Sequence, residues 1–259
     1  MSWDFETAAV EDRHLVHLYS DPIALRDAVS AWFAPAFANG GGAILVATPA
    51  HAALVKEGLA RRGLDLEGLV AADRLVVLDA RATLRAFMVD GVPDYERFLR
   101  VLQPALEKAS SGGRPVRAWG EMVDLLRKDG EVDAALMLES CWNAAMDTRD
   151  FRLLCSYEAD ALDPHTYRTL LAELCQGHSR LLGEPEAFEA EVRTSAISVL
   201  GYGVGGAVFA PQAAGATPWR MSATHAALHD LARRSPALAG RILGDVRRRR
   251  TEAAAEPPA

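Results

Sequence analysis

The sequence predicts an α/β fold, a three-layer sandwich with a mainly parallel central sheet, followed by a helical C-terminal extension. Short apolar segments alternate with helix-like segments of ten or more residues, which is typical of parallel strands joined by crossovers. The strand-like segments are not spaced as hairpins. No fixed period recurs, so a helical repeat fold is disfavoured.

Size and charge narrow the function classes. The chain has 259 residues, 50% hydrophobic and 24% charged, with mean hydropathy near zero, which is typical of a soluble globular protein with one large core. A net charge of −7 disfavours direct nucleic-acid binding. No export signal is evident at Met1, so we expect a cytoplasmic protein with no membrane partner.

The first elements have clear boundaries. His14 to Tyr19 forms an apolar strand, and Asp21 with Pro22 starts a helix that ends at Asn39. The second strand, Ala43 to Ala47, is wholly apolar, which indicates burial on both faces. Thr48 and Pro49 then start a helix from about Ala50 to Arg62.

The later elements continue the alternation. A third strand ends at Asp79, and a fifth strand follows the helix that contains Trp142. In chain order we expect a strand at Arg74 to Asp79, helices at Leu84 to Met88 and Pro93 to Ala109, a strand at Phe151 to Tyr157, and a helix from Asp163-Pro164 to near Leu182.

The stretch from Pro115 to Asn143 is the most informative. Val116 to Trp119 is a short apolar run, and after Gly120 the apolar residues change to helical spacing. Glu121 therefore lies where a strand turns into a helix, a position that favours an anion. We treat it as an exposed residue whose pKa rises through repulsion from Asp79.

Polar residues follow the predicted strands, at the edge where open parallel sheets bind ligands. Helix capping is the structural alternative for Thr48, Asp79 and Glu121. Ser20 and Glu158 lie at the same edge. The candidate ligand-binding residues are Tyr19, Thr48, His51, Asp79, Arg81, Glu121 and Tyr157.

Other motifs give no catalytic, cofactor or metal site. The chain has no Walker A loop, so ATP hydrolysis of the P-loop type is not expected. Gly201 to Gly206 fits a dinucleotide-binding pattern but lacks a surrounding strand–helix–strand unit. His14 and His17 point to opposite faces of a strand, which disfavours a shared metal. We expect reduced thiols at the three cysteines, Cys141, Cys155 and Cys175.

Several segments together resemble one protein family. They are DRHLVHLYSD, ILVATPAHAALVKEGLARRG, LVVLDARATLRAFMVDGVPD, VRAWGEMVDLLRKDGEVDAALMLESCWN and FRLLCSYEAD. In order and spacing they are similar to the MEDS domain, the sensory domain of methanogen and methylotroph regulators of the DcmR type. The resemblance covers about His14 to Leu182. It implies a RecA-like or KaiC-like fold, signal sensing, binding of small organic ligands and no established catalytic residues.

The domain organisation follows from where this resemblance fades. We expect a sensory α/β domain at 1–183, a helical extension at 184–250 and a disordered tail at 251–259. Thr224 to Arg250 is helical in pattern, with a break near Ser235-Pro236. Its apolar side chains would support homo-oligomer formation through the extension. Arg247 to Arg250 is interpreted as a solvated helix terminus, or else a contact with an acidic partner or nucleic acid.

These observations favour a non-enzymatic sensory or signalling module. It would bind a small organic ligand or a regulatory protein, and relay the signal, for example in transcription regulation. Two alternatives remain: a degenerate nucleotide-binding ATPase-like enzyme, and a purely structural adaptor. The missing P-loop argues against the ATPase.

Overall fold

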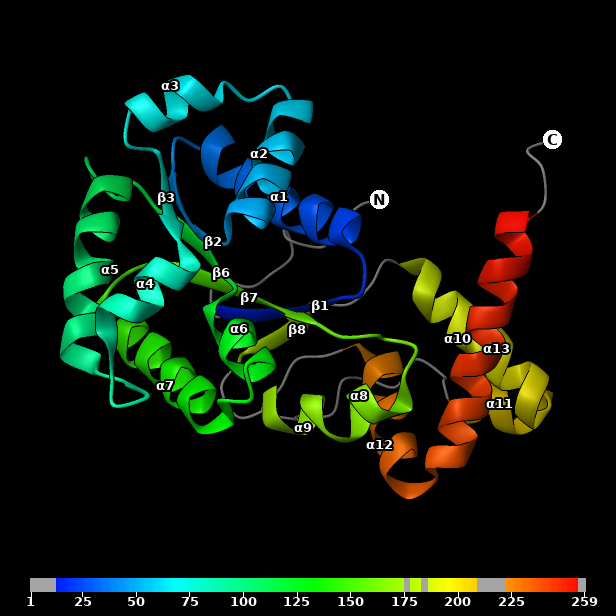
Figure 1. Cartoon of the computed structure of the whole chain (residues 1–259). Helices are drawn as coiled ribbons and strands as arrows, with labels where there is room; N and C mark the ends of the chain where they lie inside the picture. The colour runs from blue at the N-terminus through cyan, green and yellow to red at the C-terminus, as the bar shows by residue number, and fades with distance from the viewer. Residues whose placement is uncertain (1–12, 175–177, 183–185, 209–221, 256–259) are drawn as a thin grey trace. The chain divides into compact units, whose positions relative to one another are not determined.

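The computed structural model describes residues 13–174, 178–182, 186–208 and 222–255 (Figure 1). The chain divides into two compact units, the first ending at Glu158 and the second beginning at Ala159. Each unit is described by itself.

Five parallel strands form the sheet of the first unit, in the order β3-β2-β6-β7-β1. Every residue of β2 is buried, as expected for a strand covered on both faces. The predicted α/β class with a mainly parallel sheet is confirmed. The strands are β1 (His14–Tyr19), β2 (Gly42–Ala47), β3 (Leu75–Asp79), β6 (Val116–Gly120) and β7 (Arg152–Glu158).

Helices join these strands. They are α1 (Pro22–Ala38), α2 (Pro49–Arg61), α3 (Leu66–Ala71), α4 (Ala80–Phe87), α5 (Tyr95–Ala109), α6 (Met122–Lys128) and α7 (Val132–Thr148). The sequence missed α3 and the small hairpin of β4 (Met88–Val89) and β5 (Val92–Pro93). It also missed the break between α6 and α7, where Gly130 has a φ of +86° that helical residues do not adopt.

The helices cover both faces of the sheet. In Figure 1, α1 and α2 lie on one side, and α5 and α7 lie on the other. On the α1 side, the Trp32 indole N–H donates to the carbonyl of Ala118 at 3.1 Å. On the α7 side, the rings of Phe98 and Trp142 pack edge to face with centroids 4.9 Å apart. Burying large side chains such as these stabilises the fold by about 25 cal/mol per Å² of apolar area removed from water.

The second unit is mostly helical. It contains α8 (Pro164–Arg168), α9 (Leu170–Leu174), β8 (Arg180–Leu182), α10 (Glu186–Leu200), α11 (Tyr202–Val208), α12 (Ala223–Arg234) and α13 (Pro236–Ala255). The predicted break near Ser235-Pro236 is confirmed. The single helix predicted from Asp163 to Leu182 is wrong, because two short helices and a strand occupy that segment.

The predicted boundaries of the extension stay predictions. The one at residues 183/184 falls inside the second unit, whose first residue is Ala159. Residues 251–255, predicted to begin a tail, continue α13. Residues 256–259 lie outside the described part, as does Cys175.

Two motifs of the second unit have structural explanations. Gly205 lies in α11, where a Cβ would come within 2.5 Å of the Ala196 carbonyl oxygen, so the glycine allows α10 and α11 to pack closely. A helix, not a strand, precedes this motif. The arginines predicted at a helix terminus lie within α13, and each pairs with a carboxylate of the same unit, Asp160, Asp245 or Glu191. Among the described residues, no helix is long and apolar enough to cross a membrane.

Candidate functional site

The strand order identifies one place at the edge of the sheet where a ligand is expected. The chain leaves β2 toward β3 on one side, whereas it leaves β6 toward β7 on the other. The adjacent strands β2 and β6 therefore form a switch point, where the segments after the two strands diverge. In open α/β sheets this is the usual ligand position. The segments here begin at Thr48 and Glu121.

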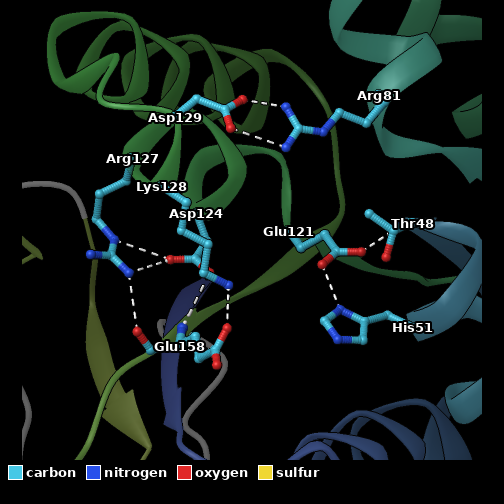
Figure 2. A network of polar contacts seen from close by, with 9 residues as sticks. All are labelled: Thr48, His51, Arg81, Glu121, Asp124, Arg127, Lys128, Asp129 and Glu158. Atoms are coloured by element: carbon cyan, nitrogen blue, oxygen red, sulfur yellow. Dashed lines mark hydrogen bonds and ion pairs between the residues drawn. The ribbon is translucent and has the colours of Figure 1, made fainter.

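Glu121 connects the two strand ends (Figure 2). Its backbone N–H donates to the carbonyl of Val46 at 3.3 Å, which continues the pairing of β6 with β2. One carboxylate oxygen accepts a short hydrogen bond from the backbone N–H of Thr48. The other lies 2.6 Å from His51 Nδ1, on the first turn of α2. The strand-end expectation for these three residues is therefore confirmed in position.

Glu121 differs from its sequence-based description in two ways. The residue is only 3% exposed, because it points inward between the strand ends rather than into solvent. Burial by itself would raise its pKa, but hydrogen bonds from His51 and Thr48 outweigh that effect and lower the pKa. The prediction that repulsion from Asp79 raises the pKa of Glu121 is wrong. Asp79 lies at the end of β3, beyond β2.

His51 is the partner of this carboxylate. Its hydrogen bond to Glu121 raises the pKa of the imidazole, which partial burial only partly opposes. The raised pKa favours the protonated imidazole, and in that form its contact with Glu121 is a charge-assisted hydrogen bond. With a side chain 20% exposed, His51 is the member of the pair that solvent can reach.

Tyr19 extends the cluster from the end of β1. Its ring packs edge-on against the His51 ring at 6.2 Å, and Lys128 Nζ lies 5.9 Å from its centroid. The residue is 5% exposed, and burial raises the pKa of its phenol well above the ordinary value. No described residue forms a hydrogen bond with its hydroxyl. A buried hydroxyl without a partner is unusual in a folded protein.

A second group of charges adjoins Tyr19 at the end of β7. Asp124 is buried on α6 and accepts from the Glu158 backbone N–H at 3.2 Å. Lys128 Nζ lies 2.8 Å from Asp124 and 2.5 Å from Glu158, and Arg127 donates to the Glu158 carbonyl at 3.0 Å. Figure 2 shows these side chains converging on the strand end. Burial would lower the pKa of Lys128, but its two carboxylate partners raise it.

Three predicted site residues lie apart from this cluster. Asp79 caps α4 by accepting from the Ala82 N–H at 2.7 Å, which is the structural alternative considered for it. Arg81 pairs with Asp129 in an exposed ion pair. The Tyr157 hydroxyl donates to Glu139 of α7. Thr48 occupies the N-cap position of α2, but its side chain forms no capping hydrogen bond.

The sequence interpretation missed Asp124 and Lys128. Both are charged residues that lie among the apolar positions of α6. Their spacing of four residues, with Arg127 between, was a usable signal for an ion-pair cluster. This spacing does not reveal that the cluster faces the end of β7.

The comparisons with known proteins give one match. A sequence model of the family described as "MEDS: MEthanogen/methylotroph, DcmR Sensory domain" matches residues 13–178, more than half of the chain. No curated protein and no solved structure matches the chain. The matched segment includes Tyr19, His51, Glu121 and Lys128.

Proposed function

Because the chain belongs to the MEDS family of sensory domains, we propose that it binds a small organic ligand at the strand ends, beside Tyr19, His51 and Glu121. Binding there would be the sensory event. The proposal also holds that the domain is not an enzyme, so the ligand is released unchanged.

The observation that carries this proposal is the buried Tyr19 hydroxyl, for which no described residue is a hydrogen-bond partner. Leaving such a group unpaired costs about 1–3 kcal/mol, so a ligand that pairs with it gains that stabilisation. The hydroxyl belongs to a side chain whose ring contacts His51 at the switch point of the sheet. The switch point of the sheet and the unpaired Tyr19 hydroxyl thus favour the same ligand position.

The charges indicate the chemistry of the ligand. Glu121 offers carboxylate oxygens, whereas His51 and the Tyr19 hydroxyl offer N–H and O–H donors. A small polar molecule with both a donor and an acceptor, such as an alcohol, an amine or an amide, fits this set. A strongly anionic ligand is disfavoured by the buried charge of Glu121.

The contacts of Lys128 provide a route for the signal. Lys128 lies over the Tyr19 ring and pairs with Asp124 and Glu158. Glu158 is the last residue of the first unit, and the chain enters the second unit at Ala159. A ligand that shifts Tyr19 or Lys128 would therefore change the contacts of Glu158, the last residue of the first unit.

One observation favours a catalytic alternative. The Glu121–His51 pair has the arrangement of a general acid or base held by a carboxylate. In that case a ligand from the same chemical classes would be converted, and His51→Gln would abolish conversion. Mass analysis of each ligand after incubation distinguishes the two functions, since a sensor returns it unchanged.

Thermal shift tests the proposal with a panel of small alcohols, amines, amides and carboxylic acids. We expect at least one neutral or cationic compound to raise the melting temperature of the wild type. Tyr19→Phe should abolish that shift. The matched control Tyr95→Phe removes a phenol from α5 whose ring stacks on Phe98, and should leave the shift intact. Equal shifts in all three proteins would contradict the proposed site.

A further inference from the structure

A second polar cluster is enclosed within the first unit, separate from the strand-end residues. It consists of His14 on β1, Cys155 on β7 and Glu139 on α7, which are 3%, 1% and 7% exposed. His14 and His17 lie on opposite faces of β1, as the sequence predicts. His14 contacts Cys155 and α7, whereas His17 lies 3.4 Å from the Ser156 hydroxyl. The proposed function uses none of these side chains.

The three side chains present their donor atoms to one point. His14 Nε2 lies 3.4 Å from Cys155 Sγ and 3.3 Å from Glu139 Oε2, and all three atoms lie within 4.8 Å of one another. In a tetrahedral zinc site, bond lengths of about 2.0–2.3 Å place neighbouring donor atoms about 3.3–3.6 Å apart. The two measured separations match that spacing.

The His14–Glu139 distance is long for a direct ion pair. A charge-assisted N–H···O hydrogen bond measures about 2.7–2.9 Å, and the Glu121–His51 pair, at 2.6 Å, is at least that short. His14 Nε2 instead lies about equally far from an oxygen and from a sulfur. Both separations are compatible with ligands around a shared ion.

Two further side chains orient the ligands. His14 Nδ1 lies 2.9 Å from the Asn143 amide oxygen, so Nδ1–H donates there and the Nε2 lone pair faces Glu139 and Cys155. The Tyr157 hydroxyl donates to Glu139 Oε1, which leaves Oε2 toward His14. Hydrogen bonds of this kind from a second layer of residues are typical of metal centres.

The geometry points to a divalent transition-metal site, of the zinc type, with His14 Nε2, Cys155 Sγ and Glu139 Oε2 as ligands. Thiolate, imidazole and carboxylate are the three ligand types that zinc takes from proteins. A divalent cation balances the negative charges of the Glu139 carboxylate and the Cys155 thiolate, which is costly to bury otherwise. Calcium and magnesium, which prefer oxygen ligands, do not fit a site with sulfur.

The alternative is an inert core thiol beside a neutral imidazole. Burial, aided by the charge of Glu139, raises the pKa of the Cys155 thiol well above its ordinary value, as such a core thiol would show. That alternative accounts for the Cys155 side chain and for its separation from His14, and the Tyr157 hydroxyl accounts for the orientation of Glu139. It does not account for the His14–Glu139 separation, which is longer than that of a direct ion pair. Metal binding distinguishes the two.

Cobalt substitution provides the direct test. The full-length protein is freed of metal with a chelator and titrated with Co²⁺, whose thiolate complexes absorb in the near ultraviolet. We expect a charge-transfer band that saturates at one equivalent and is displaced by Zn²⁺. Cys155→Ser should abolish the band. The matched control Cys141→Ser removes another buried thiol, and should keep the band.

The second-layer variant keeps the inference testable if Cys155→Ser fails to fold. Asn143→Ala retains all three ligands and should weaken Co²⁺ affinity by about 10- to 100-fold. Circular dichroism verifies that each variant is folded. A folded wild type without the band, or a band that survives in folded Cys155→Ser, would overturn the assignment. An unchanged affinity in Asn143→Ala would contradict the role of the His14 orientation.

Discussion

Two histidine–glutamate pairs occupy the first unit in different surroundings. At the strand ends, His51 and Glu121 meet at 2.6 Å, and His51 is partly open to solvent. Between the sheet and α7, His14 and Glu139 are both enclosed, lie 3.3 Å apart and share their space with a thiol. In the first pair the imidazole and the carboxylate contact each other directly, and the neighbouring Tyr19 hydroxyl is left for a ligand. In the second, the imidazole, the carboxylate and the thiol present their donor atoms to the proposed ion. The same residue types thus support different chemistry, because spacing and burial differ.

The largest expected effect concerns β6, which ends just before Glu121 and pairs with β7. Trp119 is fully buried in β6, and its indole N–H donates to the Ser156 hydroxyl at 2.8 Å. Trp119→Ala should lower the free energy of unfolding by about 3–5 kcal/mol, measured by urea denaturation. Trp119→Phe should cost less because it fills part of the cavity. An effect of Trp119→Ala below about 1 kcal/mol would show that β6 is not central to the core.

Glu121→Gln tests the strand-end pair. If Glu121 were exposed, as the sequence predicts, its replacement would cost at most about 1 kcal/mol. The buried carboxylate with two donors predicts about 1.5–3 kcal/mol instead, because hydrogen bonds to a charged group are lost. Asp79→Asn is the matched control, an exposed cap that asparagine replaces with little loss. Equal, small effects in both variants would favour the exposed description.

A pair of tyrosine variants sharpens the comparison. The Tyr157 hydroxyl donates to buried Glu139, so Tyr157→Phe should cost about 1–3 kcal/mol in denaturant unfolding. The Tyr19 hydroxyl is buried and has no described partner, so Tyr19→Phe removes an unpaired polar group and should raise the free energy of unfolding of the ligand-free protein by about 1–3 kcal/mol. If Tyr19→Phe proves the more destabilising, its hydroxyl is satisfied within the protein and the ligand argument fails.

The smallest expected effect is the pH dependence of the His51–Glu121 pair. The pKa of His51 is raised above its ordinary value of 6.5, so its stabilisation is complete below that value and is lost as pH rises through the folded-state pKa. The pKa of Glu121 is lowered from 4.5, so its contribution is lost only as pH falls through its folded-state value. The stability difference between wild type and His51→Gln should therefore shrink above neutral pH.

The comparison with His51→Gln is necessary because His17 also makes stability depend on pH. Its pKa is lowered to about 4 by burial, so its contribution changes with pH in the opposite direction to that of His51. Its stabilisation is lost as pH falls below 6.5, in both proteins alike. A wild-type minus His51→Gln difference that stays constant between about pH 5 and pH 9 would contradict the ionised pair.

The sequence predicts the strands of the first unit well, but it predicts poorly where helices are interrupted. The bounds of β1 agree with the prediction, because apolar runs bounded by Asp, Pro and Gly leave little choice. The separation of α6 from α7 and the strand Arg180–Leu182 were missed. In both places local patterns that suit one helix give way to a turn or to strand pairing that depends on distant residues.

The candidate site was predictable only where strand ends determine it. Thr48, His51 and Glu121 meet because β2 and β6 are neighbours, whereas Asp79 is separated by β2 itself. Local sequence patterns do not determine the order of the strands in the sheet. The contact between His14 and Cys155 joins residues 141 positions apart, so considering the histidines of β1 alone predicts no metal site.

Native mass spectrometry of the protein, purified gently from its own host, tests the central claim most directly. The account predicts that the wild type carries a small organic molecule whose added mass persists after chelator treatment. Tyr19→Phe should lose that mass, whereas Tyr95→Phe should retain it. A wild type without any such mass, or the same mass in folded Tyr19→Phe, would contradict ligand binding at the strand ends.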